Sequence, residues 1–201
     1  MRTAVIVDDH ASVRRSLERL LRSVGIETVT YESAEDFQAA GRPDHTACLV
    51  LDVRLPRSSG IELQDRLRRK GFSIPIVFIT GHGDVSLTVR AMKAGAIDFL
   101  VKPFDDDEFL AAVEKALEQD KVQRERDAEE SYVRDLHAQL TPREAEVFEL
   151  VVTGMLNKQI AMQLGVSEKT VKVHRGQVMR KMEAGSVPDL VRAHSVLCAA
   201  A

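Results

Sequence analysis

The stretch Ala47-Cys48-Leu49-Val50-Leu51-Asp52 decides the fold, because five consecutive apolar residues end at a carboxylate. A short apolar run without alternation is typical of a parallel strand covered by helices on both faces. The pattern recurs in residues 4–7, which are followed by Asp8 and Asp9. In open α/β sheets, functional groups collect at the carboxyl ends of the strands. The three carboxylates are therefore expected to form a cation site in which one carboxylate oxygen is left free to act as a nucleophile.

Apolar strands and helical segments alternate up to about residue 120. Candidate strands span residues 4–7, 28–31, 47–51, 76–79 and 99–101. Between them lie segments whose apolar residues have helical spacing, such as residues 12–23, where Val13, Leu17 and Leu21 share a face. This alternation predicts an α/β fold for residues 1–120, with a five-stranded, doubly wound parallel sheet.

Composition favours a globular protein. The 201 residues are 44% hydrophobic and 29% charged, with a net charge of −3, which disfavours both disorder and membrane insertion. Met1-Arg2-Thr3 leads into a strand and not into a signal peptide, so we expect a cytoplasmic protein without a membrane partner. Cys48 and Cys198 have no metal-binding or disulfide spacing and are expected to be buried or inert.

A polar segment separates this region from a second one. Residues 121–139 are predicted to form a linker helix, which is either solvent-bridging or a weak coiled coil supported by Val122, Tyr132, Val133 and Leu136. Thr141-Pro142-Arg143-Glu144 then matches a capping box with proline at the first helical position. A second domain is therefore predicted over residues 140–201.

The second domain is predicted to be entirely helical. Helices are expected over residues 142–153, 158–164 after the candidate cap Asn157, 168–182 after the cap Ser167, and 188–198. A short helix, a turn with glycine and a longer helix form a helix-turn-helix unit. Residues 138–201 carry a net charge of +2, whereas residues 1–120 carry −4, so only the C-terminal part is suited to nucleic acid.

Four strand ends together indicate phosphoryl chemistry. Asp8, Asp9 and Asp52 offer the hard oxygen ligands that suit Mg²⁺, which would offset charge while Asp52 accepts a phosphoryl group. Lys102, which ends the fifth strand, is placed to meet that group, and Thr80, which ends the fourth, could donate a hydrogen bond. One aspartate after a strand is commonly a turn or cap residue, but that explanation does not cover the joint set.

These motifs resemble a known family. Residues 1–120 look like a flavodoxin-like two-component receiver domain, in "LVLDVRLP" around Asp52, "VFITGHGD" around Thr80 and "GAIDFLVKPF", which contains Phe99 and Lys102. Residues 140–201 resemble the LuxR-type helix-turn-helix. Together they look like a response regulator of the NarL/FixJ type.

The resemblance implies a role for each matching residue of the receiver. Asp52 would accept phosphate from a sensor histidine kinase, while Asp9, Asp52 and the carbonyl of Arg54 would bind Mg²⁺ with help from Asp8. Lys102 would contact the phosphoryl oxygen, and the Lys102–Pro103 bond would be cis.

The resemblance also implies a switch. Thr80 and Phe99 match the switch pair, in which the hydroxyl moves toward the phosphoryl group and the ring turns inward. The surface of the fourth helix, fifth strand and fifth helix would then form a homodimer. The implied function is a phosphorylation-dependent transcription regulator, expected to be an activator that works with RNA polymerase.

The helix expected in the major groove carries the candidate DNA contacts. They are Lys169, Lys172, Val173, His174 and Arg175, of which Lys169 is expected at the DNA backbone or in solvent. Arg180 and Lys181 are expected at the backbone of double-stranded DNA or in solvent. Glycine inside a helix lowers the stability of the helix by about 1 kcal/mol relative to alanine. Close approach of the helix to DNA would explain why Gly176 stands there. Apolar residues of the last helix, such as Val191, pack in the core or pair two subunits.

Two other classes of function compete. A phosphatase of the haloacid-dehalogenase type would need a second aspartate two positions after Asp52, where this chain has Arg54, so we expect no enzyme. The other alternative is a DNA-binding or protein-interaction module with a vestigial receiver, against which the complete acidic set argues.

Overall fold

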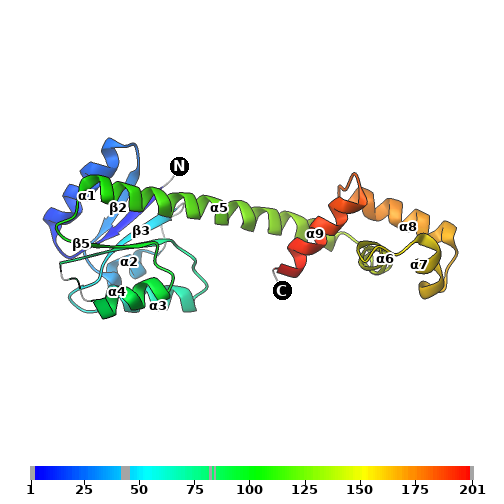
Figure 1. The fold of residues 1–201 in the computed structure, drawn as a ribbon, viewed down its shortest axis with the longest axis horizontal. Coiled ribbons are helices and arrows are strands. Elements are labelled where there is room, and N and C mark those ends of the chain that lie inside the picture. Colours follow the sequence, from blue (N-terminus) through cyan, green and yellow to red (C-terminus); the bar gives the residue numbers. More distant parts are fainter. Residues whose placement is uncertain (1–2, 42–45, 82, 84, 200–201) are drawn as a thin grey trace. The chain divides into compact units, whose positions relative to one another are not determined.

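A computed structural model describes residues 3–41, 46–81, 83 and 85–199 (Figure 1). The chain divides into two compact units, residues 1–123 and residues 124–201, and each is described by itself. Within the described residues, no helix has the length and apolarity needed to cross a membrane.

The first unit is built on a parallel sheet. Among the described residues, its five strands are β1 (Thr3–Val7), β2 (Glu27–Tyr31), β3 (Thr46–Asp52), β4 (Ile76–Thr80) and β5 (Asp98–Val101), in the order β2-β1-β3-β4-β5. The predicted α/β fold is confirmed, and each strand extends one residue further at one end or both. The strand order reverses between β1 and β3, which is where ligands bind in such sheets.

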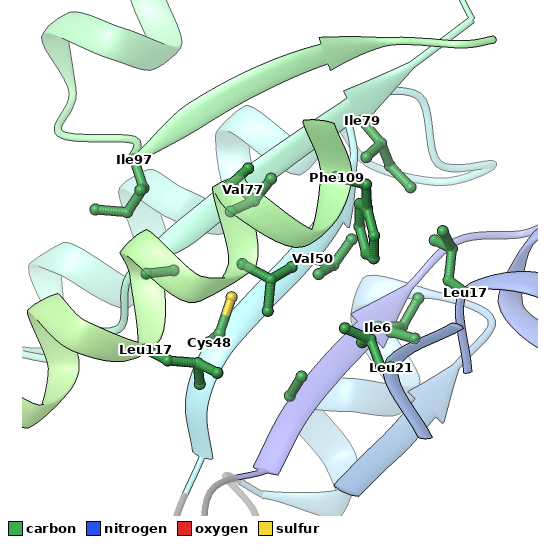
Figure 2. Packing of buried hydrophobic residues seen from close by; sticks show 14 of the residues in the cluster. Ile6, Leu17, Leu21, Cys48, Val50, Val77, Ile79, Ile97, Phe109 and Leu117 are labelled. Atoms are coloured by element: carbon green, nitrogen blue, oxygen red, sulfur yellow. The ribbon is translucent and has the colours of Figure 1, made fainter. Parts of the chain in front are cut away.

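Helices cover both faces of this sheet. They are α1 (Ala11–Ser23), α2 (Ala34–Ala40), α3 (Gly60–Arg69), α4 (Val85–Lys93) and the first part of α5 (Asp106–Ala138). Cys48 and Val50 of β3 pack with α1 and α5, as Figure 2 shows, whereas Leu49 and Leu51 pack with α2, α3 and α4. Because side chains alternate along a strand, both faces must be apolar here, which explains the uninterrupted run.

The two cysteines differ in exposure. Cys48 is fully buried, and burial, with a smaller contribution from the charge of Asp120, raises the pKa of its thiol to about 12. This thiol stays protonated and inert, as expected. Cys198 is exposed, so of the two expected alternatives, burial and inertness, burial does not hold for it.

The second unit is entirely helical over its described residues. It contains the rest of α5, then α6 (Pro142–Val152), α7 (Asn157–Leu164), α8 (Glu168–Lys181) and α9 (Val187–Ala199). Its core includes Phe148, Ile160 and Leu190, together with Val133 and Leu136 of α5. Two of the four apolar residues of the predicted linker are therefore buried in this core, while Val122 and Tyr132 are exposed.

The start of α6 matches its prediction. The Thr141 hydroxyl accepts a hydrogen bond from the backbone N–H of Glu144, whose carboxylate accepts one from the N–H of Thr141 at 2.8 Å. Lys181 donates to the same carboxylate at 2.6 Å and to the carbonyl of Gln139, which holds α8 against α6. Lys181, expected at the DNA backbone or in solvent, is thus only partly exposed and has a partner within the fold.

The start of α7 differs from its prediction. Asn157 is the first helical residue, and the N-cap is Leu156, whose N–H donates to the side chain of Gln159 at 2.8 Å. The side chain of Asn157 instead accepts a hydrogen bond from Arg175. A tertiary partner has thus replaced the capping role that the sequence suggested.

Gly60 is required by a close approach between α3 and β3. A Cβ atom there would lie 2.3 Å from the backbone oxygen of Asp52 and 2.9 Å from Leu51 Cγ. We therefore expect Gly60→Ala to lower the stability of the first unit by about 1–3 kcal/mol through overpacking. Hydrogen exchange of β3 in the full chain measures this change.

Gly176→Ala is the matched control, since Gly176 is exposed on α8 and a Cβ there meets nothing within 4 Å. It should stabilise the second unit by about 1 kcal/mol. Unchanged exchange of β3 in Gly60→Ala would contradict the close contact.

Candidate functional site

Three carboxylates meet at the carboxyl edge of β1 and β3. Asp8 and Asp52 are buried, and Asp9 is partly exposed. Among the described residues, Asp8, Asp9, His10 and Asp52 form a group whose ligand atoms all lie within 4.8 Å of one another. The strand order explains this geometry, because β1 and β3 are neighbours in the sheet although 38 residues lie between Val7, which ends β1, and Thr46, which begins β3.

The pairing of β1 with β3 thus brings Asp8 and Asp9 beside Asp52, as the sequence predicted.

Lys102 joins the two buried carboxylates. Its Nζ lies 2.5 Å from Asp8 Oδ2 and 2.8 Å from Asp52 Oδ2. The residue follows β5, two strands away from β3 in the sheet, and its peptide bond to Pro103 is cis, as expected. The ammonium group therefore offsets the repulsion between two carboxylates that are almost inaccessible to water.

Backbone N–H groups hold the other oxygens of the same carboxylates. Asp52 Oδ1 accepts from the N–H of Arg54 at 2.9 Å, and Asp8 Oδ1 accepts from the N–H of His10 at 2.8 Å. Arg14 donates to the backbone oxygen of Asp8 at 2.6 Å. Both carboxylates are thus fixed in orientation before any ligand binds, which lowers the entropy that binding would cost.

Opposing effects act on the pKa values of this group. Burial raises the pKa of Asp52, the hydrogen bonds from Lys102 and Arg54 lower it, and the nearby charge of Asp8 raises it, with a net upward shift. Burial lowers the pKa of Lys102, but its hydrogen bonds to Asp52 and Asp8 outweigh that effect and raise it. Lys102 therefore remains charged at neutral pH.

Thr80 and Phe99 lie beside this group on β4 and β5. Thr80 is buried at the end of β4, and its backbone oxygen accepts from the N–H of Lys102 at 2.7 Å. Phe99 is partly buried, with its ring centroid 6.2 Å from that of Phe78. The structure thus links Thr80 to Lys102 through the backbone and places Phe99 in the adjacent strand.

The donor set fits a magnesium ion. Three carboxylates within one ligand sphere supply the oxygen atoms that Mg²⁺ prefers, and the partial exposure of Asp9 leaves access for bound water. The N–H of Arg54 is bonded to Asp52, so this residue is held next to the same group. The acidic cluster of Asp8, Asp9 and Asp52 is typical of a Mg²⁺ site.

Sequence reasoning missed His10. Its Nδ1 lies 2.7 Å from Asp9 Oδ1 and 3.5 Å from Asp8 Oδ1. The signal available in the sequence was its position directly after the acidic pair, but nothing in the pattern showed that the side chain would turn toward the carboxylates.

In the second unit, the five predicted DNA-contacting residues of α8 differ in exposure. Lys169, Lys172 and Val173 are exposed, while Val171 and Val178 anchor the opposite side of the helix in the core. His174 and Arg175 are only partly exposed. Lys169, Lys172 and Val173 are therefore the residues of this set that are most available to a ligand.

Arg175 has a partner within the fold. Its guanidinium donates to Asn157 Oδ1 at 3.0 Å, which connects α8 to the beginning of α7. Ser167, as predicted, caps α8 by accepting from the N–H of Thr170 at 3.1 Å. These two contacts fix where α8 begins and how it packs on α7.

Comparison with protein families gives two matches along the chain. Residues 4–114 match the response regulator receiver domain, and residues 138–194 match the bacterial regulatory proteins of the luxR family. Nodulation protein W of Bradyrhizobium diazoefficiens is 52% identical, over 96% of this chain and 85% of its own length. Transcriptional regulatory protein FixJ of Azorhizobium caulinodans is 46% identical, over 93% of this chain and 89% of its own length.

A solved structure is similar over nearly the full length. The response regulator StyR aligns with a TM-score of 0.87 and 46% identity, covering 97% of this chain and 99% of its own.

The charges around Asp52 should act on its pKa in opposite directions. Lys102→Met should raise the pKa of Asp52 further, because the ammonium favours the ionised carboxylate. Asp8→Asn should lower it, because a neighbouring negative charge is removed. Carbon-13 NMR titration of the aspartate carboxyl groups in the metal-free full chain measures both shifts, and shifts of the same sign would contradict the assignment.

Proposed function

Because the chain belongs to the response regulators that join a receiver domain to a LuxR-type DNA-binding domain, we propose that phosphorylation of Asp52 controls its binding to DNA. The chain is a transcription regulator and not an enzyme, and its receiver implies a histidine kinase as partner. The observation that carries the proposal is the buried Asp52 carboxylate, held 2.8 Å from Lys102 Nζ beside Asp8 and Asp9.

The proposed reaction is phosphoryl transfer from a phosphohistidine of the kinase. A carboxylate oxygen of Asp52 forms the new bond to phosphorus while the phosphorus–nitrogen bond breaks, and the leaving imidazole takes up a proton. Lys102 then contacts a phosphoryl oxygen with the ammonium that now bonds Asp8 and Asp52. Asp8 retains a hydrogen bond from the N–H of His10 during this change.

Asp9, Asp52 and the carbonyl of Arg54, with help from Asp8, would hold Mg²⁺. When bound, this ion offsets the negative charge of the phosphoryl group and the carboxylates. The residues themselves orient the acceptor, because the N–H of Arg54 keeps Asp52 in place.

The proposed switch passes from Thr80 and Phe99 to a surface of the first unit. The Thr80 hydroxyl moves toward the phosphoryl group, and the Phe99 ring turns inward. The surface of α4, β5 and α5 carries exposed apolar side chains, namely Val85, Val89, Met92 and Val101. Such residues favour a protein partner, and we propose a second copy of the chain, giving a homodimer on phosphorylation.

Dimerisation would bring two α8 helices to adjacent half-sites in double-stranded DNA. Lys172, Val173, His174 and Arg175 are proposed to enter the major groove, with Lys169 at the phosphates. The DNA-bound dimer is expected to act as an activator and to contact RNA polymerase. On α9, Leu190 is fully buried and serves the core, whereas Val191 is exposed and is available for pairing two subunits.

The proposed domains are the receiver over residues 1–120, the linker helix over residues 121–139 and the DNA-binding domain over residues 140–201. The long helix α5 and the polar composition after Glu118 support the linker. A location in the cytoplasm, where kinase and DNA partners meet, is part of the same proposal.

Asp52→Asn should abolish phosphorylation by acetyl phosphate, because the amide cannot serve as the acceptor. Intact mass measures the added phosphate, while DNase footprinting and sedimentation measure DNA binding and dimerisation. Glu27→Gln, which changes an exposed carboxylate of β2 outside the proposed dimer surface, is the matched control and should behave as the unaltered chain. Footprints that acetyl phosphate does not change in the unaltered chain would instead support the alternative of a vestigial receiver.

Lys172→Ala should weaken specific DNA binding by about 1–3 kcal/mol without affecting phosphorylation, because it removes an exposed cation of α8. Titration of labelled DNA at fixed salt measures this loss. Arg192→Ala, which removes an exposed cation of α9, is the control. Equal losses in both variants would show that general charge, and not the position on α8, determines binding.

A further inference from the structure

His10 places a nitrogen donor among the oxygen donors of the candidate metal site. We propose that His10 Nδ1 is a ligand for divalent transition metals at this site, so that the site favours Mn²⁺ or Co²⁺ over Mg²⁺ more strongly than carboxylates alone would. The inference rests on the proposed function, which places a divalent cation at Asp9 and Asp52.

The position of His10 in the chain supports this role. It is the N-cap residue of α1, but its side chain makes no capping hydrogen bond, although N-cap side chains commonly do. Its N–H donates to Asp8 Oδ1, so the backbone is tied to the acidic cluster. The imidazole is therefore held at the site by its backbone and is not used to cap the helix.

The distances suit shared coordination. His10 Nδ1 lies 2.7 Å from Asp9 Oδ1 and 3.5 Å from Asp8 Oδ1. Adjacent ligands of an octahedral ion with bond lengths of about 2.1 Å are about 3 Å apart. A cation can therefore take the carboxylate and the imidazole together after only small adjustments, which the 67% exposure of the His10 side chain permits.

Lys102 determines on which side of the cluster the cation is accommodated. Its ammonium contacts Asp8 Oδ2 and Asp52 Oδ2, so a second cation close to these oxygens would be repelled. Asp9 is the carboxylate beside His10, with its Oδ1 2.7 Å from the imidazole Nδ1. Charge repulsion thus moves the cation toward the solvent-facing side, where the imidazole lies.

The chemistry of the imidazole gives the selectivity. Mg²⁺ takes oxygen ligands and keeps several waters, so it gains little from a nitrogen donor. First-row divalent metals bind sites that combine nitrogen and oxygen ligands, with an affinity that rises from Mn²⁺ to Co²⁺. The same site can therefore bind both classes of ion, with His10 contributing only to one.

The test uses the full chain loaded with Mn²⁺. Electron spin echo envelope modulation of the bound ion should show coupling to an imidazole nitrogen-14, and His10→Ala should remove it. His174→Ala, which deletes a histidine of the second unit, should retain the coupling. Bound Mn²⁺ without nitrogen coupling in the unaltered chain would overturn the inference.

Affinities provide the second measurement. His10→Ala should lower the ratio of Mn²⁺ to Mg²⁺ affinity by about tenfold, as expected when a histidine contribution to a metal site is lost. An unchanged ratio would overturn the inference while leaving the proposed function intact. Asp9→Asn should weaken both ions, and if it has no effect on either, the proposed cation site itself fails.

Discussion

The contact of one ammonium group with two buried carboxylates is the interaction on which the first unit's site depends. Lys102 contacts both Asp8 and Asp52. Without it, two buried carboxylates would repel each other at the carboxyl ends of β1 and β3. The two carboxylates come from the ends of strands that are distant in sequence but paired in the sheet. The same ammonium also limits where a metal ion can lie, because it already contacts an oxygen of each carboxylate.

The sheet itself could be predicted from sequence because its signal is local. Apolar runs such as residues 47–51 must be covered on both faces, and their order along the chain gives alternating strands and helices. The carboxylates at the strand ends could be placed for the same reason. Motif resemblance then supplied their expected roles, which periodicity alone does not reveal.

Side-chain contacts between distant segments could not be predicted in the same way. Asn157 has the residue type of a helix cap, yet it accepts a hydrogen bond from Arg175, and Lys181 is held by Glu144. His10 turns toward the acidic pair although its residue type is compatible with an exposed position. Each outcome depends on packing between elements, for which the sequence carries no periodic signal.

The hydrogen bond between Arg175 and Asn157 has a consequence for the ionic character of DNA recognition. Helix α8 contains five basic residues, but Arg175 and Lys181 are engaged with α7 and α6. Each phosphate that a protein neutralises releases condensed counterions, so salt sensitivity reports the cations that reach the duplex. If both contacts persist in the complex, α8 displaces fewer counterions than its five basic residues would suggest. Its preference for a DNA sequence then depends correspondingly more on contacts with base edges in the groove.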